Sequence, residues 1–139
     1  MQVFLDSNVL FSGLYSRHGA PNTILVHFAN GKIDIVISPL VLREVAAAIK
    51  LKAPAMLPLL NIFLTATSPQ IVPNPDVSSS RRWKGVLGAD DAAILTAAIS
   101  SGSEYLITGD KHFIKNPNLS SEAGIGIITP SEFIAILDR

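Results

Sequence analysis

Short apolar segments alternate with helical patterns along the whole chain, and this alternation is the feature that most constrains the fold. The apolar segments are three to five residues long, and polar or turn residues bound each of them. They lie at residues 3–5, 33–37, 70–72, 105–107 and 125–128. Strands that alternate with helices form a parallel sheet with helices on both of its faces. The sequence therefore predicts an α/β protein built on a mainly parallel sheet of four to five strands.

Helical patterns fill most of the remaining sequence. Proline suits the first turn of a helix, and Pro21, Pro39 and Pro130 stand where three of these patterns begin. The expected helices cover residues 20–28, 39–51, 55–66, 90–101 and 130–137, with a short helix or turn at 9–14 and a loop or helical turn at 111–119.

The composition describes one compact domain over residues 1–139. Of the residues, 48% are hydrophobic and 16% charged, and the net charge is zero. This balance excludes a disordered chain and an indiscriminate polycation, but not a local basic patch. The absence of cysteine excludes disulfides and thiolate metal sites. We expect a cytoplasmic protein without membrane spans, because there is no signal sequence and no apolar run near the ~20 residues that a span needs.

The stretch Gly88–Phe113 holds the densest group of acids. Asp90 and Asp91 open an alanine-rich helical pattern, and Asp110 closes Thr-Gly-Asp just after the strand at 105–107. In a parallel sheet, the carboxyl ends of all strands meet at one edge, where such folds bind ligands. These carboxylates are therefore expected at that edge.

Two further acids have equivalent positions elsewhere in the chain. Asp6 follows the first strand directly, and Glu44 lies one turn inside the helix after the second. Each acid alone has an ordinary explanation: Asp6 caps a turn, Asp90 caps a helix, or Glu44 is simply solvated. Together, five of the eleven acidic residues fall at strand ends or helix starts, and their convergence is the better interpretation.

A cluster of carboxylates needs a cation or protons. Two carboxylates ~4 Å apart repel by about 4 kcal/mol at an effective dielectric of ~20. Oxygen ligands favour a hard ion, so Mg²⁺ or Mn²⁺ is expected. Such an ion binds a phosphate oxygen and activates water, which indicates phosphodiester hydrolysis. The number of ions, one or two, stays open.

Four motifs in this order resemble those of the PIN-domain family, in the branch of toxin components of toxin–antitoxin systems. They are Phe4–Asn8, Ser38–Val45, Asp90–Ala98 and Tyr105–Phe113. The resemblance extends over residues 2–137. It implies a three-layer α/β/α sandwich and a metal-dependent ribonuclease that cleaves RNA, is often a homodimer and is silenced by an antitoxin protein.

The resemblance also implies roles for individual residues. Asp6, Glu44, Asp91 and Asp110 match the four catalytic, metal-binding acids of the family. Supporting positions are expected at Asn8 and Thr108, which match polar residues beside the acids, and at Asp90, as helix cap or outer partner of the site.

Residues 73–88 look least ordered, because two prolines and three consecutive serines interrupt them. The part of this segment that precedes the third acid is often acidic in the toxin branch, whereas here residues 78–84 are three serines followed by Arg81, Arg82, Trp83 and Lys84. Three cations and an indole can hold a phosphate backbone and stack a base, which predicts a nucleic-acid contact. The alternative is a solvated loop with Trp83 folded onto the core or a dimer partner. Among the histidines, His112 lies beside Asp110 in sequence but is expected to have no role.

These observations predict a metal-dependent endoribonuclease. One rival is a PIN-like module that has lost turnover and binds RNA or protein, although the presence of all four acids argues against it. A second is a phospho-acceptor receiver domain, which needs an acidic pair after the first strand, where Asp6 stands alone.

Overall fold

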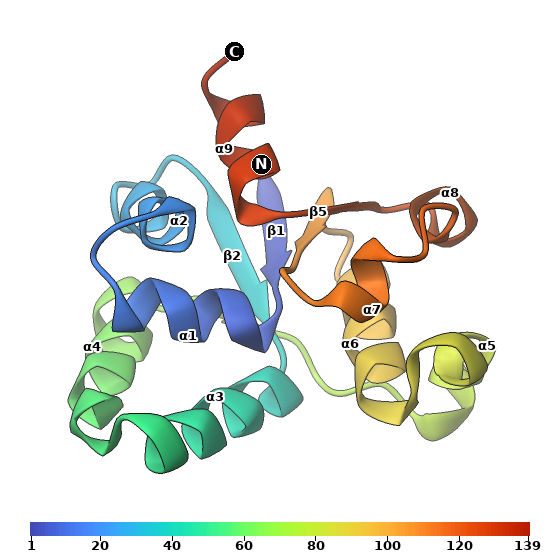
Figure 1. The fold of residues 1–139 in the computed structure, drawn as a ribbon, viewed down its shortest axis with the longest axis horizontal. Helices are drawn as coiled ribbons and strands as arrows, with labels where there is room; N and C mark the ends of the chain where they lie inside the picture. The colour runs from blue at the N-terminus through green and yellow to red at the C-terminus, as the bar shows by residue number, and fades with distance from the viewer.

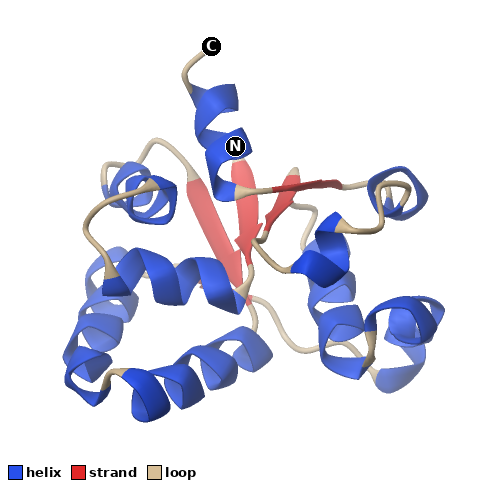
Figure 2. Ribbon diagram, in the orientation of Figure 1, coloured by secondary structure: helices blue, strands red, loops and turns tan.

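The computed structural model describes all residues, 1–139. Its centre is a sheet surrounded by helices (Figure 2). The sheet has five strands in the order β3-β2-β1-β4-β5, and every neighbouring pair is parallel. The strands are β1 (Gln2–Leu5), β2 (Asp34–Ile37), β3 (Gln70–Ile71), β4 (Tyr105–Ile107) and β5 (Gly126–Ile128). The predicted α/β class and parallel sheet are confirmed.

Nine α-helices and one short 3₁₀ helix connect the strands. They are α1 (Ser7–Tyr15), α2 (Ala20–Ala29), α3 (Pro39–Lys52), η1 (Pro54–Met56), α4 (Leu57–Thr67), α5 (Val77–Leu87), α6 (Ala89–Ser100), α7 (Lys111–Ile114), α8 (Leu119–Ala123) and α9 (Pro130–Leu137). In Figure 1, α1 to α4 lie on one side of the sheet and α5 to α8 on the other, which gives the three layers.

The strand order reverses between β1 and β4. From β1 the chain proceeds outward to β2 and β3, and then returns to pair β4 and β5 on the opposite side of β1. Open α/β sheets bind ligands at such a reversal point, outside the carboxyl ends of the strands. Here that point lies after Leu5 of β1 and Ile107 of β4, which are register partners.

Small residues let α6 pack closely on the sheet. Ala92 and Ala98 are fully buried, and so are Phe4 and Leu106 in the two central strands. The apolar core therefore holds the start of α6, and with it the acidic pair at its first turn, in a fixed position beside the carboxyl ends of β1 and β4.

The prediction that residues 73–88 are the least ordered part of the chain is wrong. Residues 77–87 form the helix α5, which packs against α6. Ser80, Trp83 and Leu87 are its buried residues. Their spacing of three and four places them on one helical face, so burial of an indole and a leucine outweighs the weak helix propensity of the serines.

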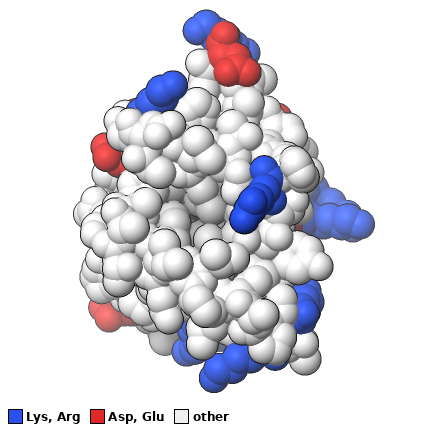
Figure 3. Space-filling model, turned by 90° about the vertical axis from the view of Figure 1, so that its left-hand side faces the viewer, with Lys and Arg blue, Asp and Glu red and all other residues white.

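One face of the molecule carries few charges. Figure 3 views the side on which α2 and α4 lie and shows a broad region without Lys, Arg, Asp or Glu. Val26 of α2 and Leu59 and Ile62 of α4 are exposed there, beside a groove of about 300 Å³. No helix in the structure has the length and apolar character that crossing a membrane requires.

Candidate metal centre

Asp6 is the most buried acid of the site, with 2% of its surface exposed. It follows β1 and forms the N-cap of α1, where Oδ1 accepts a hydrogen bond of 2.8 Å from the backbone N–H of Ser7. Oδ2 accepts from Asn8 Nδ2 at 3.1 Å and from Thr108 Oγ1 at 2.7 Å. Both oxygens are thus held in place by neighbouring donors.

Thr108 and Asn8 join the ends of β1 and β4. Thr108 is fully buried, and its hydroxyl also accepts a hydrogen bond of 3.0 Å from the backbone N–H of Asp110. The side-chain oxygen of Asn8 accepts from the backbone N–H of Gly109 at 3.0 Å. Thr108, just after β4, and Asn8, in the first turn of α1, thus link the segments that follow the two strands.

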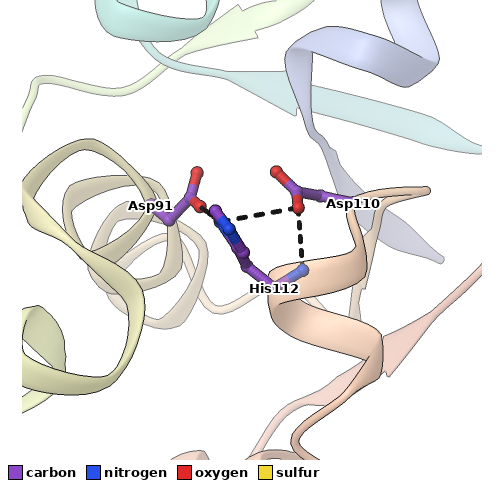
Figure 4. Close-up of side chains that lie close together, drawn as sticks. All are labelled: Asp91, Asp110 and His112. Carbon is purple, nitrogen blue, oxygen red and sulfur yellow. Dashed lines mark hydrogen bonds and ion pairs between the residues drawn. The ribbon is translucent and has the colours of Figure 1, made fainter.

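Asp110, Asp91 and His112 come together from two helices (Figure 4). Asp110 is the N-cap of α7 and accepts from the backbone N–H of His112 at 2.8 Å. His112 Nδ1 lies 3.0 Å from Asp91 Oδ2 and 3.7 Å from Asp110 Oδ1. One ligand atom from each of the three residues lies within 4.8 Å of the other two.

Glu44 reaches the site from the middle of α3. Its Oε1 accepts a hydrogen bond of 3.0 Å from Ser7 Oγ, which also lies 3.4 Å from Asp6 Oδ1. Ser7 therefore connects Glu44 with Asp6. The four predicted acids belong to one continuous set of contacts, which leads from Glu44 through Ser7, Asp6, Thr108, Asp110 and His112 to Asp91.

Three of the acids have raised pKa values. Burial is the largest cause of the raised pKa of Asp6, and the charges of Asp91 and Asp110 raise it further. The hydrogen bonds from Thr108 and Ser7 lower this pKa, but by less. Burial is also the largest cause of the raised pKa of Asp91 and of Glu44, and again neighbouring acids add to it.

His112 supplies the only ion pairs in the structure, both of them with site acids. The hydrogen bond to Asp91 and the charges of Asp110 and Asp91 raise the pKa of this exposed imidazole. No lysine or arginine pairs with the site acids. Helix N-termini at Asp6, Asp91 and Asp110 offset part of the repulsion, since the helix dipole favours negative charge there.

Asp90 does not cap its helix, so that part of the prediction is wrong. The N-cap of α6 is Gly88, whose φ of 83° lies in a region that favours glycine, and Asp90 stands in the first turn with an exposed side chain. Its charge contributes to the raised pKa of Glu44 and Asp91. Asp90 therefore acts on the site through its charge.

The basic segment of α5, residues 81–84, is not arranged as the nucleic-acid contact that the sequence predicts. Trp83 is 5% exposed, so its indole packs in the core, as the alternative interpretation has it, and presents no free face to a base. Arg82 lies over the Trp83 ring, 4.3 Å from its centroid, and donates to the carbonyl of Glu122 at 3.1 Å. Arg81 and Lys84 stay exposed.

Two residues of the site were not predicted. Ser7 bridges Asp6 and Glu44, and its only local signal is that it follows Asp6 in the first helical position. His112 meets Asp91 across 21 residues of sequence, a contact that no local pattern shows. Its signal is its place two residues after a strand-end aspartate that caps a helix.

The donor set fits a divalent cation. Partly buried carboxylates with raised pKa values, close to one another and without a lysine or arginine partner, are the environment in which a bound cation offsets repulsion. Asp91, Asp110 and His112 offer three ligand atoms at one point, and Asp6 lies beside them. The nitrogen of His112 adds to the oxygen-only ligand set that was predicted.

Solved structures share this fold. A chain of VapBC2 from Rickettsia felis, determined bound to a DNA fragment from its promoter, aligns over 93% of this chain and 98% of its own, with 21% identity and a TM-score of 0.64. FitAcB from Neisseria gonorrhoeae gives 92% and 97% coverage, 17% identity and a TM-score of 0.61. PAE2754 from Pyrobaculum aerophilum gives 99% and 98% coverage, 18% identity and a TM-score of 0.65.

No curated protein matches the chain by sequence. The family comparison does give a match, with the PIN domain, over residues 2–112. The matched region is most of the chain, and it contains Asp6, Glu44, Asp91, Asp110 and His112. The chain belongs to the PIN domain family.

Proposed function

We propose that this chain is a metal-dependent endoribonuclease and the toxin component of a toxin–antitoxin pair. The observation that carries the proposal is the convergence of Asp91, Asp110 and His112 next to the buried Asp6, at the point where the strand order reverses. In a PIN domain, a carboxylate site at this position supports phosphodiester hydrolysis.

Asp6, Asp91 and Asp110 would hold Mg²⁺ or Mn²⁺ directly or through water, with His112 as a further ligand. A divalent ion bound there would polarise the scissile phosphate and lower the pKa of water. Thr108 and Asn8 hold the Asp6 carboxylate, so that it need not reorient when the ion binds.

Glu44 would orient or deprotonate the attacking water, or join a second ion. Its raised pKa makes it a stronger base than an ordinary glutamate, which suits the role of proton acceptor. Ser7 holds one carboxylate oxygen at 3.0 Å, so the position of Glu44 relative to Asp6 is defined.

The test is cleavage of RNA by the purified chain with Mg²⁺ or Mn²⁺, with EDTA, and after Asp91→Asn. Asp34→Asn is the matched control, because Asp34 is an exposed aspartate at the opposite end of β2. We expect cleavage with metal, none with EDTA or Asp91→Asn, and normal cleavage by the control. Cleavage that survives both chelation and Asp91→Asn would contradict the metal mechanism.

We further propose that the chain binds an antitoxin protein, forms a homodimer with a second copy of itself and is located in the cytoplasm. Support for the toxin role comes from the sequence resemblance to the toxin branch and from the fold shared with chains of VapBC2 and FitAcB. The exposed Val26, Leu59 and Ile62 support a protein partner, since apolar patches often mark interfaces. Co-expression with the adjacent reading frame tests it: an antitoxin should copurify and suppress RNA cleavage.

A further inference from the structure

A groove of about 360 Å³ leads away from the metal centre between α1 and α3. At its inner end lie Ser7 and Glu44, which contact each other. Its outer part is lined by Phe11 of α1 and Lys52 of α3. Figure 1 shows these two helices leaving the sheet edge in the same direction. The groove therefore connects the acidic site with an aromatic ring and a cation.

Both walls of the groove follow the helical repeat. On α3, Glu44, Ala48 and Lys52 are spaced by four, so they share one face, and the small Ala48 leaves room between the other two. Eight residues at ~1.5 Å each put Lys52 about 12 Å beyond Glu44 along the helix. This length matches about three stacked nucleotides at ~3.4 Å each.

Phe11 on the opposite wall stacks on Tyr15, which follows it by one turn of α1 and lies beyond the residues that line the groove. Phe11 and Tyr15 stack with their ring centroids 5.7 Å apart and their planes 13° from parallel. Tyr15 is 65% exposed, so a ligand can reach it. Lys52 Nζ lies 5.7 Å from the Phe11 centroid and pairs with no carboxylate. A free cation beside exposed aromatic surface is the combination that binds single-stranded nucleic acid.

We propose that this groove holds the RNA strand next to the scissile phosphate, with Lys52 on a backbone phosphate and with the exposed Tyr15, beyond the groove's outer end, stacked on a base. The inference rests on the proposed ribonuclease function and adds the path of its substrate. A protein segment fits less well, because Phe11 and Ala48 are the groove's only hydrophobic lining residues, whereas the groove between α2 and α4 is mainly hydrophobic.

The test measures, by fluorescence anisotropy, the binding of a fluorescein-labelled, mixed-sequence single-stranded RNA in the presence of Mg²⁺. All variants in this assay also carry Asp91→Asn, which prevents cleavage of the RNA. Tyr15→Ala should weaken binding at least about five-fold, and Tyr15→Phe should restore it, since base stacking needs the ring. Lys52→Gln should lower the slope of log Kd against log salt by about 0.7, the effect of one lost phosphate contact.

Lys50→Gln is the matched control, because Lys50 is exposed on α3 but does not line the groove. It should leave both affinity and salt slope unchanged. In chains with Asp91 intact, Tyr15→Ala and Lys52→Gln should raise KM for RNA cleavage with little change in kcat, because they remove binding that substrate and transition state share. Thermal melting checks that each variant is folded.

The possible results distinguish the groove proposal from the ribonuclease proposal. RNA cleavage and binding unaffected by Tyr15→Ala and Lys52→Gln would overturn the groove proposal and leave the ribonuclease proposal standing; the groove would then serve another ligand, such as a partner's peptide. Absence of RNA binding and cleavage by the unaltered chain would overturn both.

Discussion

The hydroxyl of Thr108 donates a hydrogen bond of 2.7 Å to Oδ2 of Asp6, across 102 residues of sequence. The same hydroxyl accepts the backbone N–H of Asp110. Thr108 is fully buried at the end of β4, and Asp6 follows β1, its parallel neighbour. One threonine thus sets the distance between two acids of the metal centre.

Thr108→Val should destabilise the chain and reduce cleavage of RNA. The substitution keeps the shape of the side chain but leaves Asp6 Oδ2 with Asn8 as its only remaining donor. Loss of a hydrogen bond to a buried charged group costs about 1–3 kcal/mol of unfolding free energy. Urea denaturation measures it. Thr65→Val is the control, because the Thr65 hydroxyl is exposed and bonds within its own helix; a cost equal to that of Thr108→Val would contradict the account.

Divalent metal should stabilise the folded chain, because the metal centre exists only in the folded state. At a concentration 100 times the dissociation constant, Mn²⁺ or Mg²⁺ should add about 2.7 kcal/mol to the unfolding free energy. Asp91→Asn and Asp110→Asn should abolish the effect, and Asp34→Asn should retain it. Thermal melting with a metal titration measures this. Equal stabilisation of all three variants would place the ion elsewhere.

Without metal, stability should rise as the pH falls from 8 towards 5. The raised pKa values of Asp6, Glu44 and Asp91 mean that folding favours their protonated forms. Their contribution is complete below the ordinary pKa of each group and is lost as the pH rises through the raised pKa of the folded state.

His112 also makes the folded chain more stable at lower pH. Its raised pKa means that folding favours the charged imidazole, and this contribution to stability is lost as the pH rises through that pKa. Melting in EDTA at several pH values checks the trend, and stabilisation by Mn²⁺ should shrink as the acids are protonated. A melting temperature that falls steadily from pH 8 to 5 in EDTA would be the opposite result.

His112→Ala should weaken Mn²⁺ binding by at least about ten-fold, because even the loss of an outer partner of a metal ligand typically costs about 10–100-fold in affinity. The effect should be smaller for Mg²⁺, because imidazole suits transition metals better. Isothermal titration calorimetry measures both affinities, and His18→Ala, an exposed histidine between α1 and α2, is the control. Unchanged Mn²⁺ affinity would limit His112 to an ion pair with Asp91.

The fold was predictable because its signals are local. Apart from β3, each strand is a short apolar run followed by a polar residue. Asp6 follows such a run directly and Asp110 follows one after two residues, so the parallel arrangement places both at one edge. The helix α5 was missed because its signal is weak: Ser80, Trp83 and Leu87 form a buried face, but prolines and serines precede it. Tertiary packing decided its structure.

The site was less predictable where its contacts join residues that are far apart in the sequence. His112 meets Asp91 only because α7 begins beside the first turn of α6, and Ser7 meets Glu44 only because α1 lies along α3. The predicted role of Asp90 as a helix cap is wrong for a local reason. Gly88 adopts a positive φ at the start of α6, and the helix begins one residue before Asp90.

Cleavage restored by added metal tests whether the acidic site is a metal-dependent nuclease centre. The chain is stripped with EDTA, dialysed, and mixed with labelled single-stranded RNA while Mn²⁺ is titrated back, in parallel with Asp91→Asn and Asp34→Asn. We expect no cleavage before Mn²⁺ is added, a saturable rise in cleavage rate for the unaltered chain and Asp34→Asn, and none for Asp91→Asn. Full cleavage in EDTA, or an equal rise in Asp91→Asn, would contradict the metal-dependent mechanism.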